Sequence, residues 1–168
     1  MEKFGKTKKE IMSEKLTQEE EACNFHTTQH IRLVEKFLNL FIRELLDRAE
    51  KHDNSKLEHP EVELFAKYTS KLADSTYGSE EYNGFKKSLS VDLEHHYANN
   101  RHHPEHFKNG INDMNLVDLV EMLCDWKASS TRHNDGNIRK SIEINATRFG
   151  INPQLLKILE NTADLFDL

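Results

Sequence analysis

Residues 92–107 read D-L-E-H-H-Y-A-N-N-R-H-H-P-E-H-F and contain five of the chain's ten histidines. These are His95, His96, His102, His103 and His106. A second polar segment, residues 52–56, reads H-D-N-S-K, and three acids follow at Asp118, Glu121 and Asp125. Imidazole and carboxylate groups together suit divalent metal ions. We therefore expect the three segments to meet around one or two ions.

Helical periodicity predicts that one histidine of this stretch faces the core of the protein. Apolar residues recur at helical spacing in a helix expected over about 80–98, and His96 continues the series. The apolar members are Tyr82, Phe85, Leu89 and Leu93. His95 then lies about 100° away around the helix axis. Residues 99–114 are expected to form a loop that brings His103 back beside His96.

Helical patterns also occupy the rest of the chain. They are expected over about 27–51 with Thr27 or Thr28 as the cap, over 60–74, over 116–129 after an Asn115 N-cap, over 137–149 ending at Gly150, and from Asn152 and Pro153 onward. No strand pattern competes, and six glycines and three prolines suit long helices. The expected fold class is all-α, a compact bundle of about six helices. A charged N-terminal arm (1–22) precedes a single helical domain (23–168).

The helix over 116–129 carries both an apolar stripe and an acidic flank. Its expected core residues are Leu116, Leu119, Val120, Leu123 and Trp126. The acids at positions 118, 121 and 125 share one flank, which alone would indicate a solvated face. Asp125 adjoins Trp126 at the border of the core, where a carboxylate needs partners.

Charge and composition narrow the classes of partner. The net charge of −6 argues against binding polymeric nucleic acid, which needs a basic face. No apolar run approaches the roughly 20 residues that cross a membrane. The two cysteines, Cys23 and Cys124, lie far apart, as expected of a cytoplasmic protein. A small phosphorylated or nucleotide ligand is compatible with the charge because a bound dication reverses it locally. A homo-oligomer is equally compatible.

The patterns H-D-N-S-K, H-H-Y-A-N-N-R-H-H-P-E-H and C-D-W-K-A together resemble the HD-domain metal-dependent phosphohydrolases. Those enzymes are all-α, with an early helix histidine, an H-D pair, further histidines and a late helix aspartate. The span from His30 to Phe149 also resembles a small uncharacterised bacterial and phage family. The patterns of that family are H-I-x-x-V, R-A-x-x-H-D-x-S-K, Y-G-S-x-E-Y, R-H-H-P-E-H-F and M-N-L-x-D-L-V-E-M.

The HD-domain resemblance implies a ligand set. His52 and Asp53 match the H-D pair, Asp125 matches the late aspartate, and His96 and His103 match the histidines that hold a second metal. The implied cofactor is a divalent ion, with Mn, Fe, Zn, Ni, Co and Mg all left open. In such enzymes the metal lowers the pKa of a bound water, and the aspartate of the H-D pair bridges or orients it.

Catalytic and substrate-binding roles follow from the same comparison and from side-chain chemistry. Asp53 and Lys56 are expected to be catalytic, and Lys56 also matches a lysine that contacts the phosphate. Arg101 is expected to neutralise phosphate oxygens through its bidentate fork. His102 or His106 is expected to donate a proton to the leaving group, and His106 is also expected to bind the substrate.

Four further residues have open roles: His30, His95, Asp118 and Glu121. The HD-domain resemblance would place His30 in the site. However, a continuous helix would separate His30 from His52 by about 33 Å at 1.5 Å per residue. His30 therefore either serves elsewhere or requires a break in the helix, for example near Asn39.

Three hypotheses follow for function. The first is a metal-dependent phosphohydrolase acting on a small phosphorylated or nucleotide substrate. The second is a non-catalytic helical binding module, phage or bacterial, that captures a small anionic ligand or a host protein. The third makes the histidines purely structural.

Overall fold

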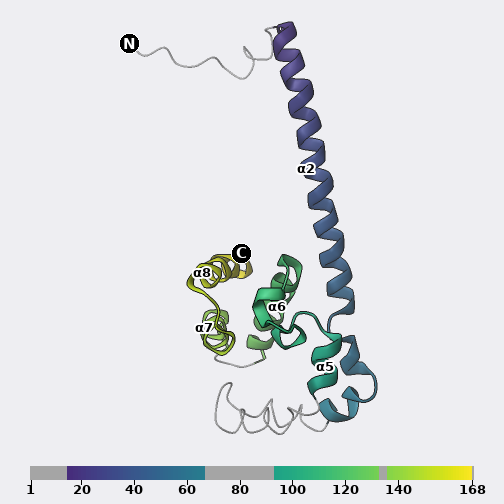
Figure 1. The fold of residues 1–168 in the computed structure, drawn as a ribbon, viewed down its shortest axis with the longest axis vertical. Helices are drawn as coiled ribbons and strands as arrows, with labels where there is room; N and C mark the ends of the chain where they lie inside the picture. The colour runs from purple at the N-terminus through teal and green to yellow at the C-terminus, as the bar shows by residue number, and fades with distance from the viewer. Residues whose placement is uncertain (1–14, 67–92, 133–135, 168) are drawn as a thin grey trace. The chain divides into compact units, whose positions relative to one another are not determined.

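The computed structural model describes residues 15–66, 93–132 and 136–167 (Figure 1). Its elements are α2 (Gln18–Lys51), the 3-10 turn η1 (Asn54–Leu57), a helical segment over 61–66, α5 (Leu93–Asn99), η2 (Pro104–His106), η3 (Gly110–Asp113), α6 (Leu116–Ser130), α7 (Ile138–Phe149), α8 (Pro153–Ala163) and η4 (Asp164–Asp167). No strand occurs in these three ranges. The predicted all-α class is confirmed.

The chain divides into two units, Met1–Arg43 and Glu44–Leu168. In the first unit, α2 begins at a capping box. The Thr17 hydroxyl accepts the backbone N–H of Glu20, and the Glu20 carboxylate accepts the backbone N–H of Thr17. The prediction that Thr27 or Thr28 caps this helix was wrong, because the Thr17 box starts the helix well upstream. No residue of α2 is buried.

The core of the second unit lies among its last three long helices. In Figure 1, α7 lies beside both α6 and α8, and residues of each pair are in contact. The buried apolar side chains of this core are Met122, Leu123, Trp126, Ile138, Ile142, Leu159 and Ala163. The Trp126 ring stacks on Phe149 with an interplanar angle of 5°. This core anchors α6, which also supplies acids to the candidate site.

The buried face of α6 agrees with the prediction in part: Leu123 and Trp126 are buried and Leu119 packs against the core, but two predicted members are exposed. Leu116 and Val120 are 67% and 38% exposed, whereas Asp118 is buried. The buried ridge runs at intervals of four, through Asp118, Met122, Trp126 and Ser130. Because Asp118 and Ser130, at the two ends of this ridge, are polar, apolar spacing did not predict it.

The predicted caps of α6 and α8 and the predicted end of α7 agree with the structure. Asn115 caps α6, and its side chain accepts the N–H groups of Val117 and Asp118. Asn152 caps α8 by accepting the N–H of Leu155. Gly150 ends α7 in the left-handed conformation (φ 61°), which glycine adopts without steric cost.

Some predictions lie outside the described residues. The helix expected over about 80–98 is described only from Leu93, so Tyr82, Phe85 and Leu89 fall outside, as do parts of the N-terminal arm, of the helix over 60–74 and of the turn near 133–135. Among the described residues, no helix is long and apolar enough to span a membrane.

Candidate metal centre

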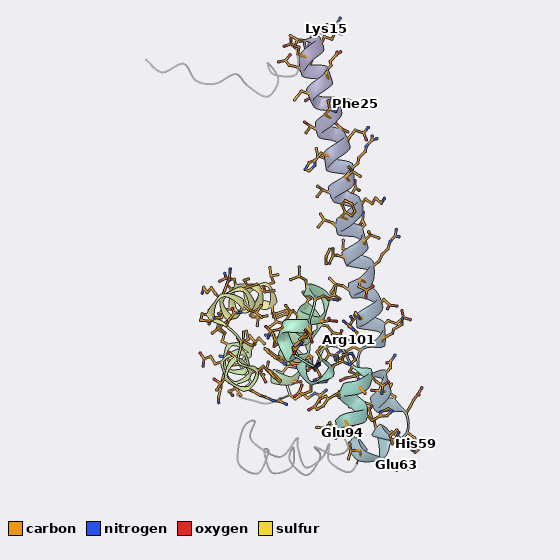
Figure 2. The ribbon with its side chains drawn as sticks, viewed as in Figure 1. Lys15, Phe25, His59, Glu63, Glu94 and Arg101 are labelled. Carbon is orange, nitrogen blue, oxygen red and sulfur yellow. The ribbon has the colours of Figure 1, made fainter. Side chains whose placement is uncertain are left out.

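Three segments of the second unit supply the side chains of the candidate centre. His52 and Asp53 follow the last turn of α2, and Asp53 has a left-handed backbone (φ 57°). His96 lies on α5, where it is buried as its periodicity predicted. The turn after α5 carries Arg101 (labelled in Figure 2) and the next two histidines, and α6 carries Asp125.

The polar side chains form two groups with metal-ligand spacing. One group is Asp53, His96, His102 and His103, and the other is His52, Asp53, His102 and Asp125. Within each group, the candidate ligand atoms all lie within 4.8 Å of one another. The groups share Asp53 and His102. Their geometry therefore suits either one ion or two neighbouring ions.

The Asp53 carboxylate lies between the two groups. Its Oδ1 is 3.5 Å from His96 Nε2 and 3.6 Å from His102 Nε2. Its Oδ2 is 3.5 Å from His52 Nε2 and accepts a hydrogen bond of 2.6 Å from Lys56 Nζ. Each oxygen thus faces a different set of histidines.

The outer members close the two groups. The Nε2 atoms of His96 and His103 are 2.8 Å apart. On the other side, His52 Nε2 lies 3.7 Å from Asp125 Oδ1. The Nε2 atoms of His52, His96, His102 and His103 all participate in these short distances, so the four rings present the same nitrogen to the centre.

Unpartnered buried atoms test whether these residues fit a metal ion. Within the described part of the chain, Asp53 Oδ1 and His102 Nε2 are buried without a hydrogen-bond partner, whereas His102 Nδ1 faces the Glu121 carboxylate at 3.1 Å. Buried polar atoms normally have partners, because leaving one unpaired costs about 1–3 kcal/mol. Asp53 Oδ1 and His102 Nε2 face each other as two potential ligands. A bound cation would satisfy both, so the residues fit a metal.

Two further carboxylates contact the opposite nitrogens of the rings. Glu121 Oε1 lies 3.0 Å from His52 Nδ1 and 3.1 Å from His102 Nδ1. Glu61 Oε2 lies 2.8 Å from His96 Nδ1, and its Oε1 lies 2.7 Å from His95 Nδ1. A carboxylate that accepts the Nδ1–H of an imidazole leaves the Nε2 lone pair available for a metal.

The electrostatics of the metal-free centre differ from ring to ring. Asp125 and Glu121 raise the pKa of His52 to about 10 against the effect of burial, and Glu121 is the nearer carboxylate. Burial lowers the pKa of His103 to about 2. Burial opposes ionisation of Glu121, but the rings of His102 and His52 outweigh it and lower its pKa to about 2. Without metal, His52 is thus a cation and His103 is neutral at pH 7.

Arginines hold the acidic flank of α6. Arg48, on the last turn of α2, donates to Asp118 Oδ1 and to Glu121 Oε2, both at 2.7 Å. Arg101 binds Asp118 through a fork of 3.1 and 3.0 Å, and its guanidinium lies over the Phe107 ring. Asp118 is fully buried and also completes the capping box of α6. It therefore serves the arginines and the helix start, and it belongs to neither ligand group.

The structure places the five predicted metal ligands, His52, Asp53, His96, His103 and Asp125, together in the two groups. His102, expected to donate a proton, is instead a member of both groups. His106 Nδ1 donates a hydrogen bond to the backbone carbonyl of Tyr97, 2.8 Å away. Arg101, expected to bind phosphate, is engaged by Asp118.

The structure also locates two residues whose roles the sequence left undecided, His95 and His30. His95 is half exposed and contacts Glu61. His30 is an exposed residue of the first unit, in the uninterrupted helix α2, so the break considered near Asn39 does not occur. Neither ligand group contains His30.

The sequence reasoning missed two important partners. Arg48 lies four residues before His52 on one helical path, and this i, i+4 spacing could have identified it. Glu61 carried no comparable signal, because an acid after a proline at a helix start is ordinary. Its position depends on how the segment over 61–66 packs against α5.

These features define an all-α protein with a buried cluster of histidines and carboxylates. Residues 19–165 match a family of unknown function (DUF5662), and the chain belongs to this family. This match agrees with the predicted membership of an uncharacterised family, whereas the HD-domain resemblance has no counterpart in it. No protein of curated function and no solved structure matches the chain.

Proposed function

We propose that the chain is a divalent-metal-dependent phosphohydrolase acting on a small phosphorylated or nucleotide substrate. One observation carries the proposal: two groups of potential ligands share Asp53 and His102, and both shared residues have buried atoms without hydrogen-bond partners. A purely structural role for the histidines would not explain why an unpartnered carboxylate oxygen faces an unpartnered ring nitrogen. A metal centre accounts for both.

Charge balance supports a cation at this position. Asp53, Glu61, Asp118, Glu121 and Asp125 surround the rings and are all buried or half-buried. The basic side chains bonded to these acids are fewer: Arg48, Lys56 and Arg101, together with the ring of His52, which is protonated without metal. His52 must lose that proton when it binds a metal, and a dication would then neutralise the excess of carboxylates.

The ligand types indicate which metals suit the centre. Four imidazole nitrogens accompany two carboxylates in the combined groups. Imidazole-rich sites suit Fe, Ni and Zn, whereas Mg, Ca and Mn prefer oxygen ligands. We therefore favour a transition metal over magnesium.

The residues of the chain have distinct roles in this proposal. A bound divalent ion supplies Lewis acidity and lowers the pKa of water. Asp53 holds the two groups together through its separate oxygens, and Asp125 completes the second group. Lys56, which is paired with Asp53 and partly exposed, provides a cation for a phosphate oxygen. Arg101 supports Asp118 instead, so phosphate recognition rests chiefly on Lys56.

The test combines metal analysis with an activity assay. We expect the purified protein to contain or take up about one or two ions per chain, measured by elemental analysis after dialysis against Mn²⁺, Fe²⁺ or Zn²⁺. The loaded protein should release phosphate from members of a panel of nucleotides and sugar phosphates. A protein that takes up no metal would overturn the proposal.

A second candidate is a non-catalytic metal-binding module for a small anionic ligand. It is favoured by one observation, namely that Arg48, Lys56 and Arg101 each already have a carboxylate partner. A loaded protein that binds a phosphorylated ligand stoichiometrically and returns it intact after denaturation would support this candidate over the hydrolase.

A further inference from the structure

Glu121 contacts two rings of the centre from outside. Its Oε1 lies 3.0 Å from His52 Nδ1 and 3.1 Å from His102 Nδ1, and its Oε2 accepts a hydrogen bond from Arg48. Both of its oxygens are therefore engaged away from the Nε2 atoms. Glu121 belongs to neither ligand group.

Glu61 has the equivalent position on the other side of the centre. It is 1% exposed, and its Oε2 lies 2.8 Å from His96 Nδ1 and accepts a hydrogen bond from the Ser55 hydroxyl. Its Oε1 lies 2.7 Å from His95 Nδ1. Glu61 is also outside both ligand groups, and no contact links it to His52 or His102 among the described residues.

We infer that Glu121 and Glu61 are two separate positioning residues, each of which orients the histidines of one half of a two-ion centre. This inference rests on the proposed function only in requiring that the centre bind metal. Glu121 orients His52, which belongs only to the group with Asp125, and His102, which is shared. Glu61 orients His96, which belongs only to the group with His103.

The physical basis is the coupling between the two nitrogens of an imidazole. A carboxylate that accepts the Nδ1–H fixes the tautomer and the ring plane, and it increases the basicity of Nε2 toward a metal. Loss of such an outer carboxylate weakens metal binding by about 10–100-fold. Because the two carboxylates act on different rings, each should tune one ion chiefly, and the two ions should differ in affinity.

The amide variants Glu61→Gln and Glu121→Gln test this division with a metal alone. Isothermal titration of the metal-free protein with Co²⁺ and Zn²⁺ should show two binding steps in the wild type. We expect Glu61→Gln to weaken one step by about 10–100-fold and to leave the other nearly unchanged. Glu121→Gln should weaken the opposite step by a similar factor, with a smaller effect on the first through His102.

The visible absorption of bound Co²⁺ gives an independent readout. Each variant should alter the spectrum that accompanies its own step, because the ring geometry at that ion changes. A residue that only stabilised the fold would lower the melting temperature of the metal-free protein without separating the two steps. Glu143→Gln, at an exposed position of α7, is the matched control and should change neither step.

Milder variants keep the test decisive if a buried amide prevents folding. Ser55→Ala removes a hydrogen bond to Glu61, and Arg48→Lys removes the guanidinium that donates to Glu121 Oε2 and to Asp118. Each should weaken the same step as the corresponding glutamine variant by a smaller factor. Equal shifts of both steps, or no shift in a folded variant, would overturn the division.

The outcome for the wild type separates this inference from the proposed function. A wild type that binds one ion and still releases phosphate would overturn the two-ion division and retain the hydrolase. Two separable steps without phosphate release would retain the division and overturn the hydrolase. A wild type that binds neither metal would overturn both.

Discussion

Asp53 has the only positive φ among the non-glycine residues that the structure describes. This conformation follows directly from its place between the end of α2 and the turn η1. It leaves one carboxylate oxygen toward His96 and His102 and the other toward His52. A single short side chain thereby reaches both ligand groups.

Asp53→Asn is expected to weaken metal binding at both steps by more than the roughly 10–100-fold typical of an outer partner. Asparagine tolerates the left-handed conformation, so the backbone should be retained while the charge is lost. Elemental analysis after dialysis measures the loss. Glu143→Gln serves as the control, and an Asp53→Asn protein with full metal content would contradict the shared role.

Metal uptake should displace a proton from His52. In the metal-free protein its pKa is raised from 6.5 to about 10, so the ring holds a proton throughout that pH range. Binding at Nε2 requires a lone pair, and affinity should therefore rise by up to about tenfold per pH unit toward pH 10. Titration in buffers of different ionisation enthalpy measures the released protons.

His52→Gln provides the comparison for this prediction. It should release about one proton fewer on binding, because the titrating ring is gone. His106→Gln changes a ring that donates to the Tyr97 carbonyl and should release as many protons as the wild type. Uptake that is independent of pH would show that His52 is not a ligand.

Residue types in the sequence predicted five of the six members of the ligand groups, whereas the membership of His102 depends on the backbone of the turn after α5. The expected ligands were recognisable because H-D and paired histidines are unusual in a solvated loop. The contribution of His102 was not, because both His102 and His103 face inward only through the irregular turn after α5. In a strand, two adjacent side chains point to opposite faces, and in a helix they lie about 100° apart, so neither pattern predicted that both would face the centre.

At the scale of elements, α6 joins the core to the candidate centre. Its buried ridge begins at Asp118 among the arginines and continues through Met122 to Trp126 in the core. The last turn of α2 meets this ridge through Arg48. The caps of α6 and α8 were predictable because they depend on local sequence. The face of α6 was predictable only in part, because its buried aspartate depends on two distant arginines.

Arg48→Met should destabilise the protein by about 3 kcal/mol, because it removes the cation that two buried carboxylates share. The Arg48 side chain is 15% exposed and bridges Asp118 and Glu121, which are 0% and 10% exposed. Urea denaturation of the metal-free protein measures the change. Lys51→Met lies in the same turn, where the lysine is 67% exposed, and should cost less than about 1 kcal/mol. Equal effects of the two substitutions would contradict the role of the bridge.

At the scale of the molecule, the second unit brings together ligands from residues 52–53, 96–103 and 125. The sequence predicted its all-α class because no strand pattern competes with the helical one. It did not predict how the segments would meet, because the turns after α2 and α5 depend on tertiary contacts such as that between Asn100 and Ser55.

Metal should therefore stabilise the folded chain as a whole. An ion at 100 times its dissociation constant adds about 2.7 kcal/mol, which corresponds to a rise in melting temperature of about 5–11 °C for a chain of this length. A chelator should reverse this rise, and calorimetry with and without EDTA measures it. The Asp53→Asn variant should melt at the same temperature in both conditions, and a wild type that behaves likewise would contradict the centre.

The close approach of His96 and His103 also constrains insertions and deletions in the segment between them. Their Nε2 atoms are 2.8 Å apart, and between them Asn100 is buried, with hydrogen bonds to Ser55 and to the His96 carbonyl. Adding or deleting one codon in this interval would turn at least one of these side chains away from its partner. Substitutions at the exposed positions of the interval, such as Ala98 and Asn99, leave that spacing intact. Related chains should therefore vary in the residues between these two histidines while keeping their number constant.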